Sequence, residues 1–124
     1  MVLLLDTHIL VWLTTGDRRL TPEARAAVIE RHEPIAVSAI IAWEYADLGR
    51  RGRLATAVPF DALLIGYDLD VVPLPAAVWR LAATLPDVHR DLIDRMLIAH
   101  AIAEGRAIVT ADAMIRRYPV RCIG

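Results

Sequence analysis

The chain contains no lysine, because all 14 of its cationic residues are arginines. This absence excludes protein classes whose chemistry requires a lysine, among them receiver domains and P-loop nucleotide triphosphatases. The single cysteine, Cys122, cannot form a disulfide within the chain, so we expect a reducing, cytoplasmic location. No apolar run approaches the roughly 20 residues that span a bilayer. The apolar start of the chain also lacks the basic segment of a secretory signal.

The chain also has few aromatic residues and almost no net charge. Aromatic side chains make up 6% of the sequence, whereas hydrophobic residues make up 56% and the mean hydropathy is +0.43. A core of Leu, Ile, Val and Ala is therefore expected, large enough to be covered on two sides. The net charge of −1 provides no global positive field that would indicate nucleic-acid binding. We expect one domain that spans residues 1–124.

Short apolar strands alternate with helices along the sequence. Runs of apolar residues between turn signals predict strands at 2–5, 35–37, 71–72, 107–109 and 120–123. Capping and proline signals predict helices around Ile9–Leu13 and over 22–32, 39–51, 59–67, 75–85, 91–104 and 113–117. This alternation predicts an α/β fold, with a central, mainly parallel sheet of four to five strands and helices on both faces.

Polar residues follow the predicted strands, at the edge where parallel sheets bind ligands. Asp6, Ser38 and Thr110 come directly after strands or within one residue of them, and Asp112 follows two residues after Thr110. Each crossover helix returns antiparallel to the strands and so begins at the same edge. The start of the helix that contains Asp94 therefore belongs to this edge as well.

The aspartates at this edge each have a purely structural alternative. Asp6 and Asp112 precede helices and are suited to cap them. Asp91 is suited to cap the helix of Asp94, whose carboxylate is stabilised by the positive end of the helix.

Glu44 is harder to explain structurally, because the pattern places it on an apolar helix face. It lies four residues after Ile40 and four before Leu48. An unpaired carboxylate on such a face costs several kcal/mol. The structural alternative is a buried ion pair with Arg90 or Arg95.

Together, the four acids at Asp6, Glu44, Asp94 and Asp112 predict a cation site. Clustered carboxylates repel one another and raise one another's pKa unless a cation is present. Hard oxygen ligands without a cysteine indicate Mg²⁺ or Mn²⁺ rather than zinc. Such ions activate water and stabilise the leaving oxygen when a phosphodiester is cleaved.

Two other α/β classes do not match the residues after the first strand. A phosphatase of the haloacid dehalogenase type needs a second aspartate two residues after the first, but Asp6 is followed by Thr7 and His8. A dinucleotide-binding fold needs a glycine-rich turn after the first strand, and none follows Leu5.

Four sequence blocks resemble the PIN-domain family and, more narrowly, its VapC toxins. The blocks are LLLDTHILVW, VSAIIAWEYA around Glu44, HRDLIDRMLIAHA around Asp94, and IVTAD, which ends at Asp112. They occur in the family's order and cover essentially the whole chain, so the resemblance implies a PIN-like domain. Where relatives usually have Asp-Pro-Phe-Asp, this chain has Asp91-Leu92-Ile93-Asp94, which keeps both acids and removes the proline.

The resemblance implies the roles of individual site residues. Asp6, Glu44, Asp94 and Asp112 would be the catalytic residues and would hold one or two Mg²⁺ or Mn²⁺ ions, directly or through water. Supporting positions beside these acids are Thr7, Ser38, Asp91 and Thr110.

The resemblance further implies an endoribonuclease that cleaves transfer, ribosomal or messenger RNA and arrests translation. A homodimer and a cognate antitoxin, with a segment in an apolar groove, are implied as partners. The alternative is a PIN scaffold that binds protein or RNA without catalysis. The presence of all four acids favours the enzyme.

The other notable residues are candidates either for contacts with RNA or for packing in the core. Arg90 and Arg95 flank the start of the Asp94 helix and are candidates for contacts with RNA phosphates. His89 is a weaker candidate for contacting the substrate, and His100 is expected in the core or an interface. Helical contexts favour core or dimer packing for the three tryptophans, and burial without chemistry for Cys122.

Overall fold

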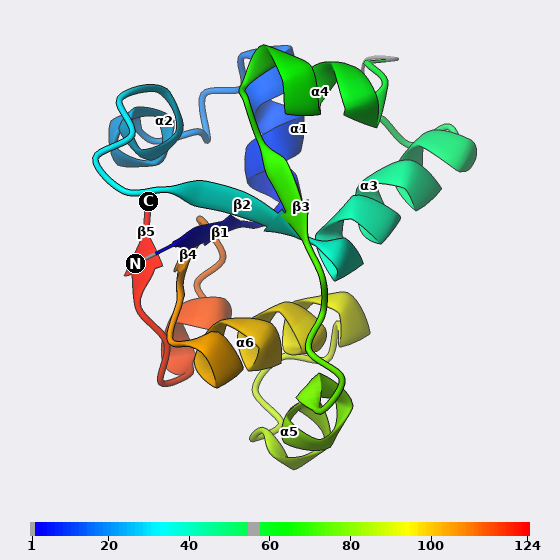
Figure 1. The fold of residues 1–124 in the computed structure, drawn as a ribbon, viewed down its shortest axis with the longest axis vertical. Coiled ribbons are helices and arrows are strands. Elements are labelled where there is room, and N and C mark those ends of the chain that lie inside the picture. Colours follow the sequence, from blue (N-terminus) through cyan, green and yellow to red (C-terminus); the bar gives the residue numbers. More distant parts are fainter. Residues whose placement is uncertain (1, 55–57) are drawn as a thin grey trace.

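A five-stranded parallel sheet forms the centre of the protein (Figure 1). The computed structural model describes residues 2–54 and 58–124. The strand order is β3-β2-β1-β4-β5, and every pair of neighbours is parallel. The strands are β1 (Leu3–Leu5), β2 (Ile35–Ser38), β3 (Asp70–Val72), β4 (Ala107–Val109) and β5 (Cys122–Ile123).

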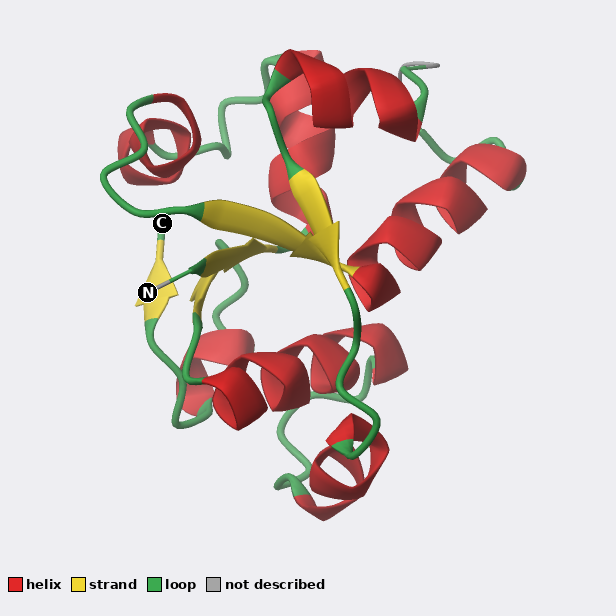
Figure 2. Ribbon diagram, viewed as in Figure 1, coloured by secondary structure: helices red, strands yellow, loops and turns green. Residues whose placement is uncertain are grey.

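Helices cover both faces of this sheet (Figure 2). Helices α1, α2 and α4 lie on one side and α5 and α6 on the other, while α3 contacts both α1 and α6. The predicted α/β class and parallel sheet are therefore confirmed. The helices are α1 (Thr7–Thr15), α2 (Pro22–Ile29), α3 (Ala39–Arg50), α4 (Phe60–Gly66), α5 (Val78–Thr84), α6 (Leu92–Glu104) and the 3₁₀ helix η1 (Ile115–Arg117).

Some predicted boundaries were wrong by a few residues. Helix α2 ends before residue 32 because Arg31 adopts a left-handed backbone with φ of 52°. Helix α5 starts three residues after Pro75, since the chain first makes a turn in which Val78 N–H donates to the Pro75 carbonyl. The last strand is shorter than predicted and covers only Cys122–Ile123.

The inner strands are buried on both faces, which explains their unbroken apolar sequences. Leu4 lies at the centre of the sheet, in register with Ala36 on β2 and Ile108 on β4. All three side chains are buried. Because β1 pairs in parallel with both β2 and β4, the carboxyl ends of these three strands reach the same edge of the sheet.

Local signals at this edge turn the chain from strand into helix. The Ser38 hydroxyl accepts a hydrogen bond from Ile40 N–H at 3.4 Å where β2 passes into α3. The Asp91 carboxylate caps α6 by accepting from the N–H groups of Ile93 and Asp94, at 2.9 and 3.2 Å. The predicted capping role of Asp91 is thereby confirmed, and α6 begins at Leu92 without the proline that relatives have.

None of the helices in residues 2–54 and 58–124 combines the length and the apolar composition that crossing a bilayer requires.

Replacing Leu4 with alanine is expected to destabilise the fold by about 2–5 kcal/mol, because the central strand cannot collapse onto the cavity that is left. Urea unfolding monitored by circular dichroism measures this loss. Ile65→Ala is the matched control, since Ile65 is 83% exposed and its truncation should change stability by at most about 0.5 kcal/mol. Equal effects of the two substitutions would contradict the burial of β1.

Candidate active site

Asp6 is buried at the carboxyl end of β1, with only 2% of its surface exposed. Its Oδ2 accepts a hydrogen bond from Thr110 Oγ1 at 2.8 Å. Its Oδ1 has no hydrogen-bond partner within the described part of the chain. The side chain does not cap α1, although Asp6 occupies the N-cap position. The structural alternative for Asp6 was therefore wrong, and a buried carboxylate oxygen is left for another partner.

Thr110 joins two of the acids. Its hydroxyl donates to Asp6 and accepts from the Asp112 N–H at 3.0 Å, so it fixes the spacing of the two residues. Asp112 Oδ1 in turn accepts from Met114 N–H at 2.7 Å. This bond stabilises the turn before η1, but Asp112 does not cap that helix, whose N-cap residue is Met114, so the predicted capping role was wrong.

Glu44 is half-buried on α3, and no arginine of the described residues forms an ion pair with it. Arg95, one of the two arginines considered as partners of Glu44, binds backbone carbonyls instead. Its guanidinium donates to the carbonyls of Ala82, Leu85 and Pro86 at 2.7, 2.9 and 3.0 Å. The other alternative, Arg90, is exposed. The predicted Glu–Arg pair is therefore not formed.

The charges of the four acids act on one another. Burial, followed by the charges of Asp6, Asp91, Glu44 and Asp112, raises the pKa of Asp94 from 3.8 to about 8. Burial also raises the pKa of Asp6, although the hydrogen bond from Thr110 opposes this shift. The pKa of Glu44 is raised by burial and by the charges of Asp91 and Asp6.

The acids predicted from distant parts of the sequence thus lie together. Their hard oxygen atoms, their mutual repulsion and the unpartnered Asp6 Oδ1 all fit a divalent cation. Burial and this repulsion together raise the free-energy cost of ionising Asp94 when no cation is bound.

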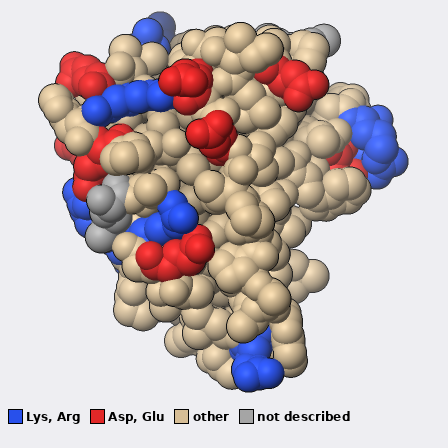
Figure 3. Space-filling view, in the orientation of Figure 1, with Lys and Arg blue, Asp and Glu red and all other residues tan. Residues whose placement is uncertain are grey.

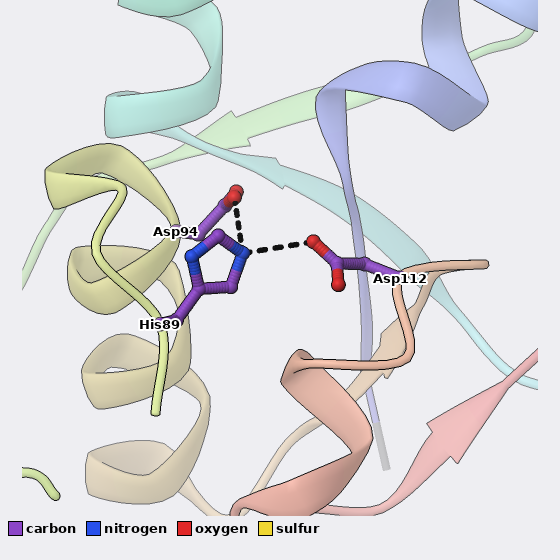
Figure 4. Close-up of side chains that lie close together, drawn as sticks. All are labelled: His89, Asp94 and Asp112. Carbon is purple, nitrogen blue, oxygen red and sulfur yellow. Dashed lines mark hydrogen bonds and ion pairs between the residues drawn. The ribbon is translucent and has the colours of Figure 1, made fainter. Parts of the chain in front are cut away.

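A histidine lies between two of these acids (Figure 4). His89 Nε2 is 2.9 Å from Asp94 Oδ2 and 2.8 Å from Asp112 Oδ2. Burial would raise the pKa of Asp112, but the hydrogen bonds from His89 and from Met114 N–H outweigh burial and hold the pKa below its ordinary value. The sequence indicated His89 only as a contact with the substrate. Its position two residues before the cap of α6 was the available signal.

A cavity of about 240 Å³ opens beside Asp6 and Asp112. Its other walls include Trp12 and Arg19, whose guanidinium lies 4.9 Å from the centre of the Trp12 ring. The two oxygens of Asp17 hold the same guanidinium, at 3.1 and 2.8 Å. The sequence did not single out Arg19, because no local pattern connects this residue to Asp112, which is far away along the chain.

The predicted supporting hydroxyls have different environments. Thr110 contacts two acids, and Thr7 is buried directly after Asp6. Ser38 Oγ instead lies 2.8 Å from Nδ1 of the fully buried His100. His100 Nε2 contacts Glu104 Oε1 at 2.7 Å. Ser38 therefore connects β2 to α6, and His100 is a core residue as predicted.

The fold and the site define a parallel α/β domain with a cluster of acids at the carboxyl edge of its sheet. The family model of the PIN domain matches residues 3–120, and the chain belongs to this family. It is 32% identical to ribonuclease VapC22 of Mycobacterium tuberculosis over 118 residues, which cover 93% of this chain and 90% of that protein.

Two solved structures share the fold. The first is VapBC2 from Rickettsia felis bound to a DNA fragment from their promoter, with a TM-score of 0.66 and 17% identity over 98% of this chain and 97% of that chain. The second is PAE2754 from Pyrobaculum aerophilum, with a TM-score of 0.61 and 18% identity over 98% of this chain and 83% of that chain.

In metal-free buffer at pH 8, Asp94→Asn is expected to raise the melting temperature by about 5 °C or more. A carboxyl group whose pKa is raised by folding stabilises the fold while it is protonated. That contribution is lost as the pH rises from about 4 to about 8, and asparagine has no proton to lose.

Thermal unfolding from pH 5 to pH 9 with a chelator present measures this dependence. Asp70→Asn is the control, because it removes the same formal charge at an exposed position on β3. Parallel curves for the wild type and Asp94→Asn would contradict the clustering of the acids.

Proposed function

We propose that this protein is a divalent-metal-dependent endoribonuclease and the toxin of a toxin–antitoxin pair. The observation that carries the proposal is the buried acidic cluster, in which each acid raises the energetic cost of ionising Asp94. A relative with 32% identity, ribonuclease VapC22, supports RNA as the substrate.

Asp6, Glu44, Asp94 and Asp112 are proposed to hold Mg²⁺ or Mn²⁺ and to be the catalytic residues. An ion bound there would polarise the phosphodiester and lower the pKa of a bound water molecule. Thr110 orients Asp6 and Asp112 through its hydroxyl group. Asp91 sets the start of α6 and thereby the position of Asp94. Ser38 contributes less directly, because its hydroxyl contacts His100.

RNA phosphates need cationic contacts near these acids. Arg90 is exposed directly before the cap of α6, whereas the Arg95 side chain is only 12% exposed and is bound to backbone carbonyls. We therefore favour Arg90 over Arg95 as a phosphate contact and add Arg19, which lines the cavity beside Asp6. On the face drawn in Figure 3, arginines are scattered among acids and uncharged surface, so these contacts would be local ones.

Asp6→Asn is expected to lower the rate of RNA cleavage by on the order of 100-fold or more. Loss of a group that merely supports a metal ligand already costs about 10–100-fold. The assay follows cleavage of total RNA in Mg²⁺ or Mn²⁺ on a denaturing gel, with a chelator lane. Asp70→Asn, an exposed acid outside the cluster, should cleave as the wild type does.

Full cleavage by Asp6→Asn at equal purity would contradict the site assignment. A wild type that is stabilised by metal but cleaves no RNA would instead favour the scaffold that binds without catalysis.

A second copy of the chain is the first proposed partner. Trp79 on α5 and Leu92 on α6 line one shallow apolar hollow with Met96, and they are 60% and 76% exposed. We call these three residues the α5–α6 patch. Exposed apolar patches of this kind are typical of protein interfaces. Trp43 on α3 is also 55% exposed, whereas Trp12 is buried.

Trp79→Asp is therefore expected to convert a dimer into a monomer of 13.7 kDa. Sedimentation velocity measures the mass. Ile65→Asp is the matched control, because Ile65 is an exposed apolar residue on α4, outside the α5–α6 patch. A dimer that survives Trp79→Asp but not Ile65→Asp would place the interface elsewhere.

A cognate antitoxin is the second proposed partner, supported by the fold shared with VapBC2. An apolar groove of about 390 Å³ between α3 and α4 is suited to receive a partner segment. Described residues that line it are Tyr45, Ala46, Gly49, Gly52, Leu54, Val58, Pro59 and Phe60.

A further inference from the structure

His89 lies where the carboxylates of Asp94 and Asp112 converge (Figure 4). Its Nε2 is within 2.9 Å of one carboxylate oxygen of each acid, and its side chain is only 13% exposed. These three ligand atoms lie within 4.8 Å of one another, close enough to surround a single metal ion. The question is whether the imidazole is a ligand of that ion or its substitute.

The hydrogen bond at the other ring nitrogen, Nδ1, distinguishes the two roles. The backbone N–H of Asp91 donates a hydrogen bond to His89 Nδ1 at 3.2 Å, so Nδ1 carries a lone pair. The proton of the imidazole must therefore be on Nε2, which donates toward Asp94 and Asp112. A histidine that binds a metal through Nε2 has the opposite arrangement, because it usually donates its other N–H to an acceptor.

The Nε2–H group thus takes over part of what a cation would do. Hydrogen bonds to ionised carboxylates are short, and the distance of 2.8 Å to Asp112 falls in that range. The same bond contributes to the lowered pKa of Asp112. An ion bound to the same two oxygen atoms would need the space that the N–H group fills.

The backbone that carries His89 is held firmly. The Tyr118 hydroxyl accepts from the N–H groups of Val88 and His89, at 3.2 and 2.8 Å, and donates to the Pro86 carbonyl at 2.6 Å. Arg95 holds the carbonyls that precede this loop. Movement of the imidazole therefore requires rotation of its own side chain and no change in the loop.

We propose that His89 is a built-in substitute for the cation: its Nε2–H group holds Asp94 and Asp112 together in the metal-free protein, and a divalent ion binds these acids by displacing it. This proposal rests on the metal-binding part of the proposed function. A metal site made of four acids does not by itself need a donor that competes with the ion. The proposal makes His89 a positioning residue that sets the metal affinity.

The test is a calorimetric titration of Mn²⁺ into the wild type and His89→Ala. Removing the competing hydrogen bonds should tighten Mn²⁺ binding by about tenfold. The metal-free form of His89→Ala should melt at a lower temperature than the wild type, because its two carboxylates lose their donor. His89→Gln, whose amide also offers an N–H group, should restore the affinity of the wild type.

His32→Ala is the matched control, because the His32 side chain is 86% exposed and pairs with Glu30, away from the acidic cluster. Its affinity for Mn²⁺ should equal that of the wild type.

A second readout is the nitrogen NMR spectrum of the histidine rings, recorded with and without Mg²⁺. The metal-free protein should show the proton of His89 on Nε2, and saturating Mg²⁺ should abolish the contacts of this N–H group. A proton on Nδ1 in the presence of Mg²⁺, together with weaker Mn²⁺ binding by His89→Ala, would identify His89 as a ligand and overturn the proposal.

The remaining outcomes are also decisive. Unchanged Mn²⁺ affinity in His89→Ala would overturn this proposal alone and leave the four-acid metal site intact. A wild type that binds no divalent ion would overturn both proposals. Metal binding with the expected effect of His89→Ala, but without RNA cleavage, would contradict only the nuclease.

Discussion

The repulsion between carboxylates at one edge of the sheet is the constraint on which the rest of the structure depends. Two parallel strands, β1 and β4, bring Asp6, Thr110 and Asp112 to this edge, and two helices that begin there bring Glu44 and Asp94. Such a cluster is unfavourable in water-excluded surroundings, as the pKa of about 8 at Asp94 indicates. The surrounding fold must therefore supply stability that the site removes.

Neutral hydrogen-bond donors limit this cost without removing it. The Thr110 hydroxyl donates to Asp6, the Met114 N–H donates to Asp112, and the His89 imidazole lies between Asp94 and Asp112. One oxygen of Asp6 nevertheless stays without a partner in the described part of the chain. A cluster of this kind favours the binding of a cation, since the ion neutralises the negative charge that the hydrogen bonds leave uncompensated. Stability is thus sacrificed locally where function needs affinity for a metal.

Sequence reasoning identified the four acids but left the role of each one open. Capping was an adequate explanation for Asp6 until the structure showed its side chain bound to Thr110. An arginine partner was an adequate explanation for Glu44 until Arg95 was found on backbone carbonyls. His89 and Arg19 reach the site from loops, and loops follow no hydrophobic period. Apolar periods therefore could not place these two residues at the site, and only the closeness of His89 to the cap of α6 pointed to its contact with Asp112.

The sequence by itself determined the α/β class, the order of strands and helices, and which acids would stand at the carboxyl edge of the sheet. These features follow from local apolar periods, caps and strand direction, which are properties of neighbouring residues. Only the tertiary structure decided how each carboxylate is shared: Asp6 with Thr110, and Asp94 and Asp112 with the imidazole of His89. Those pairings depend on side-chain directions across segments that meet only after folding, because hydrogen bonds require matching of distance and angle in space.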